Sequence, residues 1–283
     1  MRDKPSPCDK RSRDFSRSAE KRLKSLLQNQ MNEPLPKPVS EVWRPEMVRL
    51  PKMTRSRRAF RAFGHGLIKL AAKICLNVSS EGMENFPHSG PMMVVINHIG
   101  DSDVPALIST LPCPPDALAK IELYELPILG KLMDWYGVIW LHRGHADIRA
   151  IRAALDGFAE SRIIVIAPEG RYSVTGTLEE GTGGAAFLAY KSGAAILPIA
   201  ITGTENENVY GHMKKFRRAR VHVKVGKMFK LAEQASGGVL PKEHRDYVSA
   251  SKGRQEVVAQ GTRQIMQALA NLLPEKYRGE YSS

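Results

Sequence analysis

The feature that most constrains the fold is an alternation of short apolar runs with amphipathic segments, which starts near Val78 and continues to the C-terminal end. Runs such as Met92–Asn97 and Ile163–Ala167 are too short for buried helices, so they predict strands covered on both faces. Between them, Asp147–Glu160 has an apolar residue every three or four positions and an aspartate suited to cap a helix. This alternation predicts an α/β fold with a mixed, mostly parallel sheet flanked by helices. Further strands are expected at 117–121, 137–141, 195–202 and 220–229, and further helices at 104–111, 128–136, 184–191 and 255–273.

The positive charge of the chain is concentrated before this region. Met1–Cys75 holds 19 Lys and Arg against 7 Asp and Glu, whereas the remaining residues hold 23 against 22. The sequence therefore predicts a basic, flexible N-terminal extension over residues 1–55, with a short helix near Ala19–Gln30. Such an extension suits an anionic partner, and either a lipid surface or a solvated tail fits the composition. Nucleic acid is disfavoured because few aromatic residues are interleaved with the cations.

Residues 56–76 predict an amphipathic basic helix that joins this extension to the rest of the chain. An apolar stripe and a basic stripe occupy different faces of the expected helix. Such a helix either lies on a membrane with its cations toward the headgroups or packs its apolar face on the protein. The apolar stripe comprises Phe60, Phe63, Leu67, Leu70, Ala71 and Ile74, and the basic stripe comprises Arg61, His65, Lys69 and Lys73.

Several classes of protein do not fit the composition. No run of about 18 apolar residues predicts an ordinary transmembrane helix, and the first residues lack the apolar core of a secretory signal. The three cysteines, Cys8, Cys75 and Cys113, are scattered, which disfavours a disulfide framework or a cysteine zinc site.

Polar residues capable of chemistry follow the expected strands directly. Asn97-His98-Ile-Gly-Asp-Ser-Asp103 comes after the first buried run, and an imidazole with a carboxylate five residues on is suited to remove a proton from a hydroxyl. A metal site built from His98, Asp101 and Asp103 is a weaker alternative, because the sequence offers no second histidine nearby.

Two further clusters follow other expected strands. Pro168-Glu169-Gly170-Arg171 comes after Ile163–Ala167, and Arg143 comes after 137–141. Glycine allows a ligand to approach the backbone, and arginine offers a planar donor to phosphate or carboxylate. A surface turn with a charge pair would explain the second cluster equally well. If the strands are parallel, however, all three clusters lie at one edge of the sheet, where ligands bind in open α/β folds.

Taken in order, these motifs resemble the glycerophospholipid acyltransferase family, of the lysophosphatidic acid acyltransferase type. The similarity rests on Asn97-His98-x4-Asp103, Gly137…Arg143, Pro168-Glu169-Gly170 and Leu197-Pro198-Ile199, and it extends over Val78–Thr202. It implies a catalytic domain at 77–232, which a C-terminal loop and helix at 233–283 would complete. It also implies a peripheral enzyme at the cytoplasmic face of a membrane, with a lipid acceptor and no cofactor.

The resemblance also implies a role for each matching residue. His98 would deprotonate the acceptor hydroxyl and Asp103 would orient His98, while the donor would be an acyl thioester, from acyl-CoA or acyl carrier protein. The acceptor would be a lysophospholipid or glycerol phosphate. The residues implied in substrate binding are Asn97, Lys120, Arg143, Glu169, Gly170, Arg171 and Pro198; no metal is implied.

One departure bears on the acceptor. The family commonly reads Glu-Gly-Thr-Arg, whereas this chain reads Glu169-Gly170-Arg171-Tyr172. The arginine is shifted by one position, which weakens the expectation of a phosphate-bearing acceptor and leaves the His98–Asp103 pair intact. Two alternatives stay open at this point: a thioesterase that uses water as acceptor, and a non-catalytic membrane-binding member of the fold.

Overall fold

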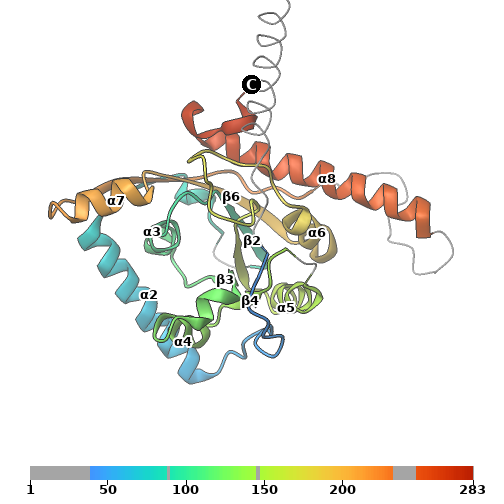
Figure 1. Ribbon diagram of the computed structural model, residues 1–283, viewed down its shortest axis with the longest axis horizontal. Coiled ribbons are helices and arrows are strands. Elements are labelled where there is room, and N and C mark those ends of the chain that lie inside the picture. The colour runs from blue at the N-terminus through green and yellow to red at the C-terminus, as the bar shows by residue number, and fades with distance from the viewer. Residues whose placement is uncertain (1–38, 88–89, 145–146, 232–246, 283) are drawn as a thin grey trace, which may run out of the picture. The chain divides into compact units, whose positions relative to one another are not determined.

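The predicted apolar runs form the strands of one central sheet. A computed structural model describes residues 39–87, 90–144, 147–231 and 247–282. Seven strands form one sheet in the order β1-β7-β6-β2-β5-β3-β4, and every neighbouring pair is parallel except β6 with β7 (Figure 1). The predicted mixed, mostly parallel sheet is therefore confirmed. Its strands are β1 (Leu76–Glu81), β2 (Met92–Ile96), β3 (Asp116–Lys120), β4 (Ile139–Leu141), β5 (Ile163–Ile166), β6 (Ala195–Thr202) and β7 (Ala219–Val225).

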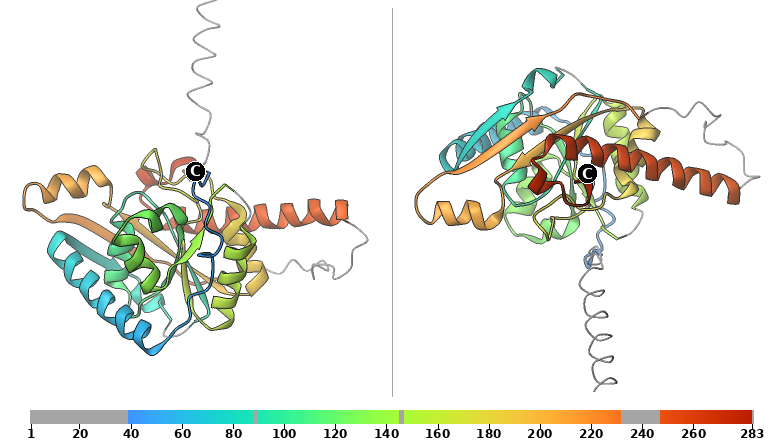
Figure 2. Two further views of the ribbon diagram at one scale, coloured as in Figure 1. Left: turned by 60° about the horizontal axis from the view of Figure 1, so that its bottom comes forward. Right: turned by 90° about the horizontal axis from the view of Figure 1, so that it is seen from above.

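Strand β2 divides its side chains between two hydrophobic cores, as the two-residue period of a strand requires. Met93 and Val95 belong to one core, which includes residues of α5, α6 and α8. Met92, Val94 and Ile96 belong to the other, which includes residues of α2 and α3. Helices thus cover both faces of the sheet (Figure 2). The helices are α2 (Arg55–Cys75), α3 (Asp103–Thr110), α4 (Leu129–Tyr136), α5 (Ile148–Ala159), α6 (Gly183–Ser192), α7 (Asn206–Met213) and α8 (Tyr247–Leu272), with short 3-10 turns η1 (Met83–Asn85), η2 (Ile121–Glu125), η3 (Glu275–Tyr277) and η4 (Gly279–Tyr281).

Helix α2 forms where the sequence predicts it, but the expected orientation of its faces is wrong. Arg61 and His65, from the expected basic stripe, are buried, while Phe63, Leu67 and Ile74, from the apolar stripe, are 70%, 53% and 64% exposed. The alternative in which the apolar face packs on the protein is therefore wrong, while docking of that face on a membrane stays a prediction.

A buried ion pair is the physical reason for this reversal. The guanidinium of Arg61 bonds to the carboxylate of Asp116 at the start of β3, and to the carbonyl oxygens of Tyr136 (3.0 Å) and Pro114 (2.8 Å). Losing one partner of such a pair leaves a buried charge uncompensated, so the contact fixes which face of α2 is inside.

Two elements of the structure, α7 and β1, were not predicted. Helix α7 lies in a segment with no apolar periodicity, and β1 begins directly where α2 ends, with a largely polar sequence. The predicted helix at Ala19–Gln30, most of the basic extension and the loop at 232–246 lie outside the described residues. The described residues from 39 onward belong to one unit, Pro38–Ser283.

Candidate active site

The end of β2 is held firmly against its neighbouring strand. The side-chain amide of Asn97 donates to the carbonyl oxygen of Ile201 (2.8 Å), and its oxygen accepts from the Ile201 N–H (2.7 Å). Asn97 is buried and bridges the ends of β2 and β6. This use of both ends of the amide fixes the strand from which His98 projects; a direct contact of Asn97 with substrate stays a prediction.

His98 and Asp103 form a close pair at the sheet edge. The Nδ1 atom of His98 lies 2.7 Å from Oδ2 of Asp103, and the imidazole is 19% exposed while the carboxylate is fully buried. An ionised carboxylate accepts hydrogen bonds and donates none. This contact therefore assigns the ring proton to Nδ1 and leaves the lone pair on Nε2. Among the described residues no hydrogen-bond partner occupies that Nε2 atom.

Asp103 is buried because its oxygens are satisfied. Oδ2 also accepts the N–H groups of Ile99 (2.7 Å) and Gly100 (2.9 Å), and Oδ1 accepts the hydroxyl of Thr204. Asp103 begins α3, where the helix dipole favours a negative charge. At Gly100 a Cβ atom would lie 2.0 Å from the Thr204 carbonyl oxygen, so only glycine allows the loop to close this tightly.

The cluster after β5 meets the same histidine. Oε1 of Glu169 accepts the N–H of His98 (2.9 Å), and the carbonyl oxygen of His98 accepts the N–H of Ser173 (2.7 Å). The ring of Tyr172 lies against the imidazole, with centroids 4.0 Å apart. The predicted meeting of the two clusters at one edge is therefore what the structure has, since β2 and β5 are adjacent and parallel.

Glu169 is the most perturbed acid of this edge. Burial raises the pKa of its carboxyl to about 8, and hydrogen bonds from the Glu179 and His98 amides oppose that rise. Gly170 follows with a φ of 74°, a backbone conformation that favours glycine and turns the chain sharply. Burial and the nearby Asp101 carboxylate likewise raise the pKa of Tyr172.

The other predicted substrate residues lie at different places. Arg171 donates from Nε to Glu179 (2.7 Å), and each of these two side chains is 11% exposed. Lys120 ends β3 and Arg143 follows β4, so both are at the same edge as His98. Two strands separate β4 from β2, which places Arg143 roughly 14 Å away at ordinary strand spacing. Pro198 is buried inside β6, opposite Val95. Their roles stay predictions.

A second His-x4-Asp pair was missed in the sequence, although the spacing of His142 and Asp147 would have found it. Nδ1 of His142 lies 2.7 Å from Oδ2 of Asp147, the same contact as in the first pair. Here, however, Nε2 accepts the N–H of Arg44 (3.0 Å), and the Trp43 ring covers the imidazole at 4.3 Å. Asp147 also caps α5 by accepting the N–H groups of Arg149 and Ala150. We call this pair closed, because both ring nitrogens of His142 are hydrogen-bonded within the protein. Its contacts join the segment around Arg44 to the start of α5.

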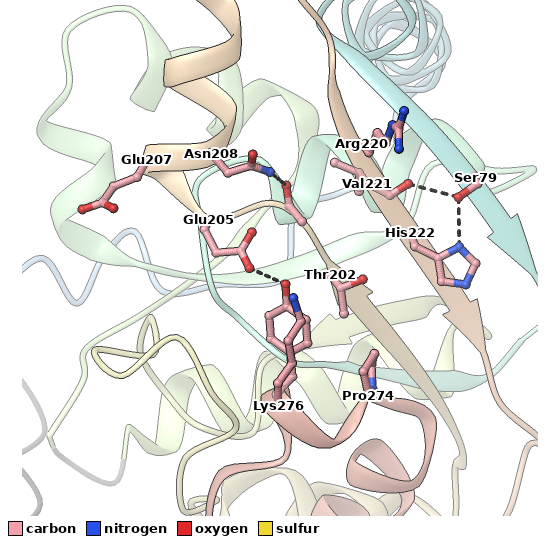
Figure 3. A pocket seen from close by; sticks show the side chains of 12 residues that line it. Ser79, Thr202, Glu205, Glu207, Asn208, Arg220, Val221, His222, Pro274 and Lys276 are labelled. Carbon is pink, nitrogen blue, oxygen red and sulfur yellow. Dashed lines mark hydrogen bonds between the residues drawn. The ribbon is translucent and has the colours of Figure 1, made fainter.

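A polar hollow lies next to the Thr204 support of Asp103. It has a volume of about 650 Å³, and Glu205, Arg220 and Lys276 are among the residues that line it (Figure 3). The hydroxyl of Tyr277 donates to Glu205 at 2.5 Å, which ties the C-terminal turn η3 to the residue after Thr204. The C-terminal segment thus contributes to the support of the His98–Asp103 pair.

This combination of fold and site agrees with the comparisons. Residues 77–202 match the protein family model described as Acyltransferase, which confirms the resemblance for that segment. The chain is 30% identical over 151 residues to a chloroplastic 1-acyl-sn-glycerol-3-phosphate acyltransferase of Arabidopsis thaliana, covering 51% of this chain and 42% of the relative. A 1-acyl-sn-glycerol-3-phosphate acyltransferase of Borreliella burgdorferi is 31% identical over 131 residues, covering 44% of this chain and 51% of the relative.

Two other comparisons add to these. A lyso-ornithine lipid O-acyltransferase of Pseudomonas aeruginosa is 31% identical over 113 residues, covering 40% of this chain and 43% of the relative. The chain therefore spans about half the length of these relatives or less. The crystal structure of the 1-acyl-sn-glycerophosphate acyltransferase from Thermotoga maritima has a TM-score of 0.51 and 23% identity, covering 75% of this chain and 84% of that one. That similarity supports the fold.

Proposed function

We propose that this protein transfers a fatty acyl group from an acyl thioester, carried by coenzyme A or acyl carrier protein, to a hydroxyl of a lysophospholipid or glycerol phosphate. The observation that carries the proposal is the His98 imidazole, held by Asp103 at Nδ1 and open at Nε2. The closed His142 pair shows that this spacing also serves a purely structural purpose, so the open Nε2 atom is the decisive difference.

The proposed reaction needs one base and no covalent enzyme intermediate. Nε2 of His98 takes the proton of the acceptor hydroxyl while the oxygen attacks the thioester carbonyl carbon. The tetrahedral intermediate collapses as the carbon–sulfur bond breaks, and the imidazolium returns its proton to the leaving thiolate. Asp103 stabilises the imidazolium between these steps. Base catalysis of this kind typically contributes about 100- to 10,000-fold.

A lysophospholipid acceptor resides in a membrane, and α2 is the element that would dock there. Phe63, Leu67, Leu70 and Ile74 form an exposed stripe along the helix, here called the α2 stripe. Helix α4 packs beside α2, with the Trp135 and Phe60 rings 5.7 Å apart. Its exposed residues Ile128, Leu129 and Leu132 enlarge the apolar surface. No helix among the described residues is long and apolar enough to cross a bilayer.

The acceptor headgroup has two candidates. Tyr172 stands beside His98 where the family has arginine, and Arg171 is bonded to Glu179. An acceptor without a phosphate is therefore a second candidate, and the match to a lyso-ornithine lipid O-acyltransferase supports including such a lipid in the test.

The test is incubation with acyl-CoA and separate acceptors, namely lysophosphatidic acid, a lyso-ornithine lipid, glycerol phosphate and water alone, with products identified by mass. We expect acylated lipid to form, and we expect His98→Ala to lower thiol release by about 100-fold or more. The matched control is His142→Ala, whose histidine has the same carboxylate contact but a closed Nε2 atom.

Each outcome selects one reading. Thiol release with free fatty acid and no acylated lipid would identify a thioesterase. Binding to vesicles without thiol release would identify a non-catalytic member of the fold. Near-normal release by a folded His98→Ala protein would remove the mechanism.

A further inference from the structure

The turn between α7 and β7 carries an unusual set of exposed side chains. Met213–Arg218, here called the basic tip, reads Met-Lys-Lys-Phe-Arg-Arg, and all six residues are exposed. Phe216 is 101% exposed, so its whole ring is in solvent. The segment from 208 to 220 contains no aspartate or glutamate. In the described part of the chain, no carboxylate forms an ion pair with Lys214, Lys215, Arg217 or Arg218.

Backbone hydrogen bonds hold the tip in a defined helix-ending motif. The N–H of Arg217 returns to the carbonyl oxygen of His212 (2.9 Å), and the N–H of Phe216 bonds to Met213 (2.9 Å). This pair of bonds requires the residue just after the helix to be left-handed, and that residue is Phe216, with a φ of 52°. Glycine is the usual residue at that position because a side chain disfavours the conformation. The chain thus presents an exposed aromatic ring where glycine would suit the fold better.

The basic tip adjoins the end of the α2 stripe. The guanidinium of Arg218 donates to the carbonyl oxygen of Lys73 (3.3 Å), in the last turn of α2, and Ile74 follows at the end of the stripe. In Figure 1 the turn after α7 lies on the same side of the molecule as the end of α2. One surface therefore combines an apolar stripe with a cluster of uncompensated cations around a single aromatic ring.

We propose that the basic tip is a membrane contact that binds anionic phospholipid, with Phe216 inserted among the acyl chains and the four cations at the headgroup phosphates. The inference extends the proposed docking of α2, to which the tip adds the preference for anionic lipid. An acidic protein partner would also match the charge. Six residues, however, are far fewer than the roughly 20–30 that each partner contributes to a stable protein interface.

The test compares partition of the full-length protein onto vesicles of phosphatidylcholine alone and of phosphatidylcholine mixed with phosphatidylglycerol. We expect the wild type to prefer the mixed vesicles. The double variant Lys214→Gln/Lys215→Gln should lower that partition by about 10- to 30-fold, at the usual contribution of a cation near an anionic surface. Lys191→Gln/Lys227→Gln, two exposed lysines away from the tip, is the matched control and should change little.

A second variant tests the contribution of the Phe216 ring to membrane binding without a change in charge or a loss of stability. Phe216→Gly relieves the left-handed conformation, so the thermal midpoint should stay equal or rise. Partition should nevertheless fall by about tenfold or more on both kinds of vesicle, because an inserted ring is lost.

Two results would overturn the proposal. Unchanged partition of the lysine and phenylalanine variants would exclude a lipid contact at the tip. Loss of acyl carrier protein binding, with vesicle partition intact, would identify a protein-docking surface instead. Thiol release from acyl-CoA in detergent micelles is read in parallel and should be unaffected by these variants. If the wild type releases no thiol, acyl transfer is refuted while the partition result still decides the inference about the tip.

Discussion

At the scale of single residues, the two His-x4-Asp pairs differ in what surrounds one nitrogen atom. His98 and His142 make the same 2.7 Å contact with an aspartate five residues on. The difference lies in Nε2, which the Arg44 amide closes in His142 and no described residue closes in His98. The His-x4-Asp spacing finds both pairs in the sequence but does not show which Nε2 atom is open. The residues that close His142, Trp43 and Arg44, are about a hundred positions away in sequence.

Thr204 supports the His98–Asp103 pair through a single hydrogen bond, so its role can be tested by removing one hydroxyl. Its hydroxyl donates to Oδ1 of Asp103, and Asp103 in turn holds His98. Thr204→Val keeps the shape of the side chain and removes the donor, so one oxygen of a buried carboxylate is left unsatisfied. We expect a loss of about 1–3 kcal/mol in unfolding free energy. Thiol release should fall by about 10- to 100-fold, because the imidazole loses its fixed alignment.

Thr204→Ser is the control for that prediction, since it restores the hydroxyl. Steady-state thiol release and chemical denaturation of the three proteins would be compared. Equal rates in the wild type and the valine variant would mean that the Thr204 bond has no part in positioning the pair.

At the scale of elements, α2 shows where sequence reasoning ends. The helix itself is predictable from the spacing of its apolar residues, and so are β2, β5 and α5. The side that faces inward is not predictable, because it depends on Asp116, a partner 55 positions from Arg61. Helix α7 was missed because Asn206–Met213 has no apolar period to detect.

The exposed α2 stripe leads to a prediction about docking. Leu67→Ser/Leu70→Ser removes two half-exposed leucines that touch little of the protein interior, so unfolding free energy should change by only about 0.5 kcal/mol. Partition onto neutral phosphatidylcholine vesicles should fall by about tenfold or more, since each buried leucine contributes about 1.5–3 kcal/mol. Flotation with vesicles measures this directly.

Ile148→Ser is the matched control, because Ile148 is 60% exposed on α5, at the opposite face of the sheet. Equal flotation of the α2 variant and this control would assign neutral-lipid docking to another surface.

At the scale of the whole molecule, one buried acid links the site to stability. The motif Pro168-Glu169-Gly170 was visible in the sequence, and the order of the strands then places it beside His98. The sequence could not show that Glu169 bonds to the amides of both His98 and Glu179 and so joins two loops. Contacts of this kind depend on loop closure, which has no periodic signal.

The raised pKa of Glu169 predicts how stability depends on pH. Since the folded pKa is about 8 and the ordinary value is 4.5, the folded state binds more protons between these values than the unfolded state does. Its contribution to stability is therefore complete below the ordinary value and is lost as pH rises toward about 8, with a slope of up to about 1.4 kcal/mol per pH unit.

Glu169→Gln should remove that slope, while lowering stability by about 1–3 kcal/mol because its NH₂ group faces a backbone N–H. Urea unfolding at several pH values measures both effects. If wild type and variant lose stability in parallel over this window, the slope belongs to other groups.

The two histidine pairs have a consequence for how the proposed activity would be lost. The closed pair shows that one backbone amide and one indole ring are enough to occupy an imidazole whose aspartate contact is intact. A homologous chain could therefore keep every residue of the first motif and still be inert, if a neighbouring loop laid an amide over the outer nitrogen. Whether a homologue is active therefore depends on access to the Nε2 atom of the histidine as well as on the residues of the motif.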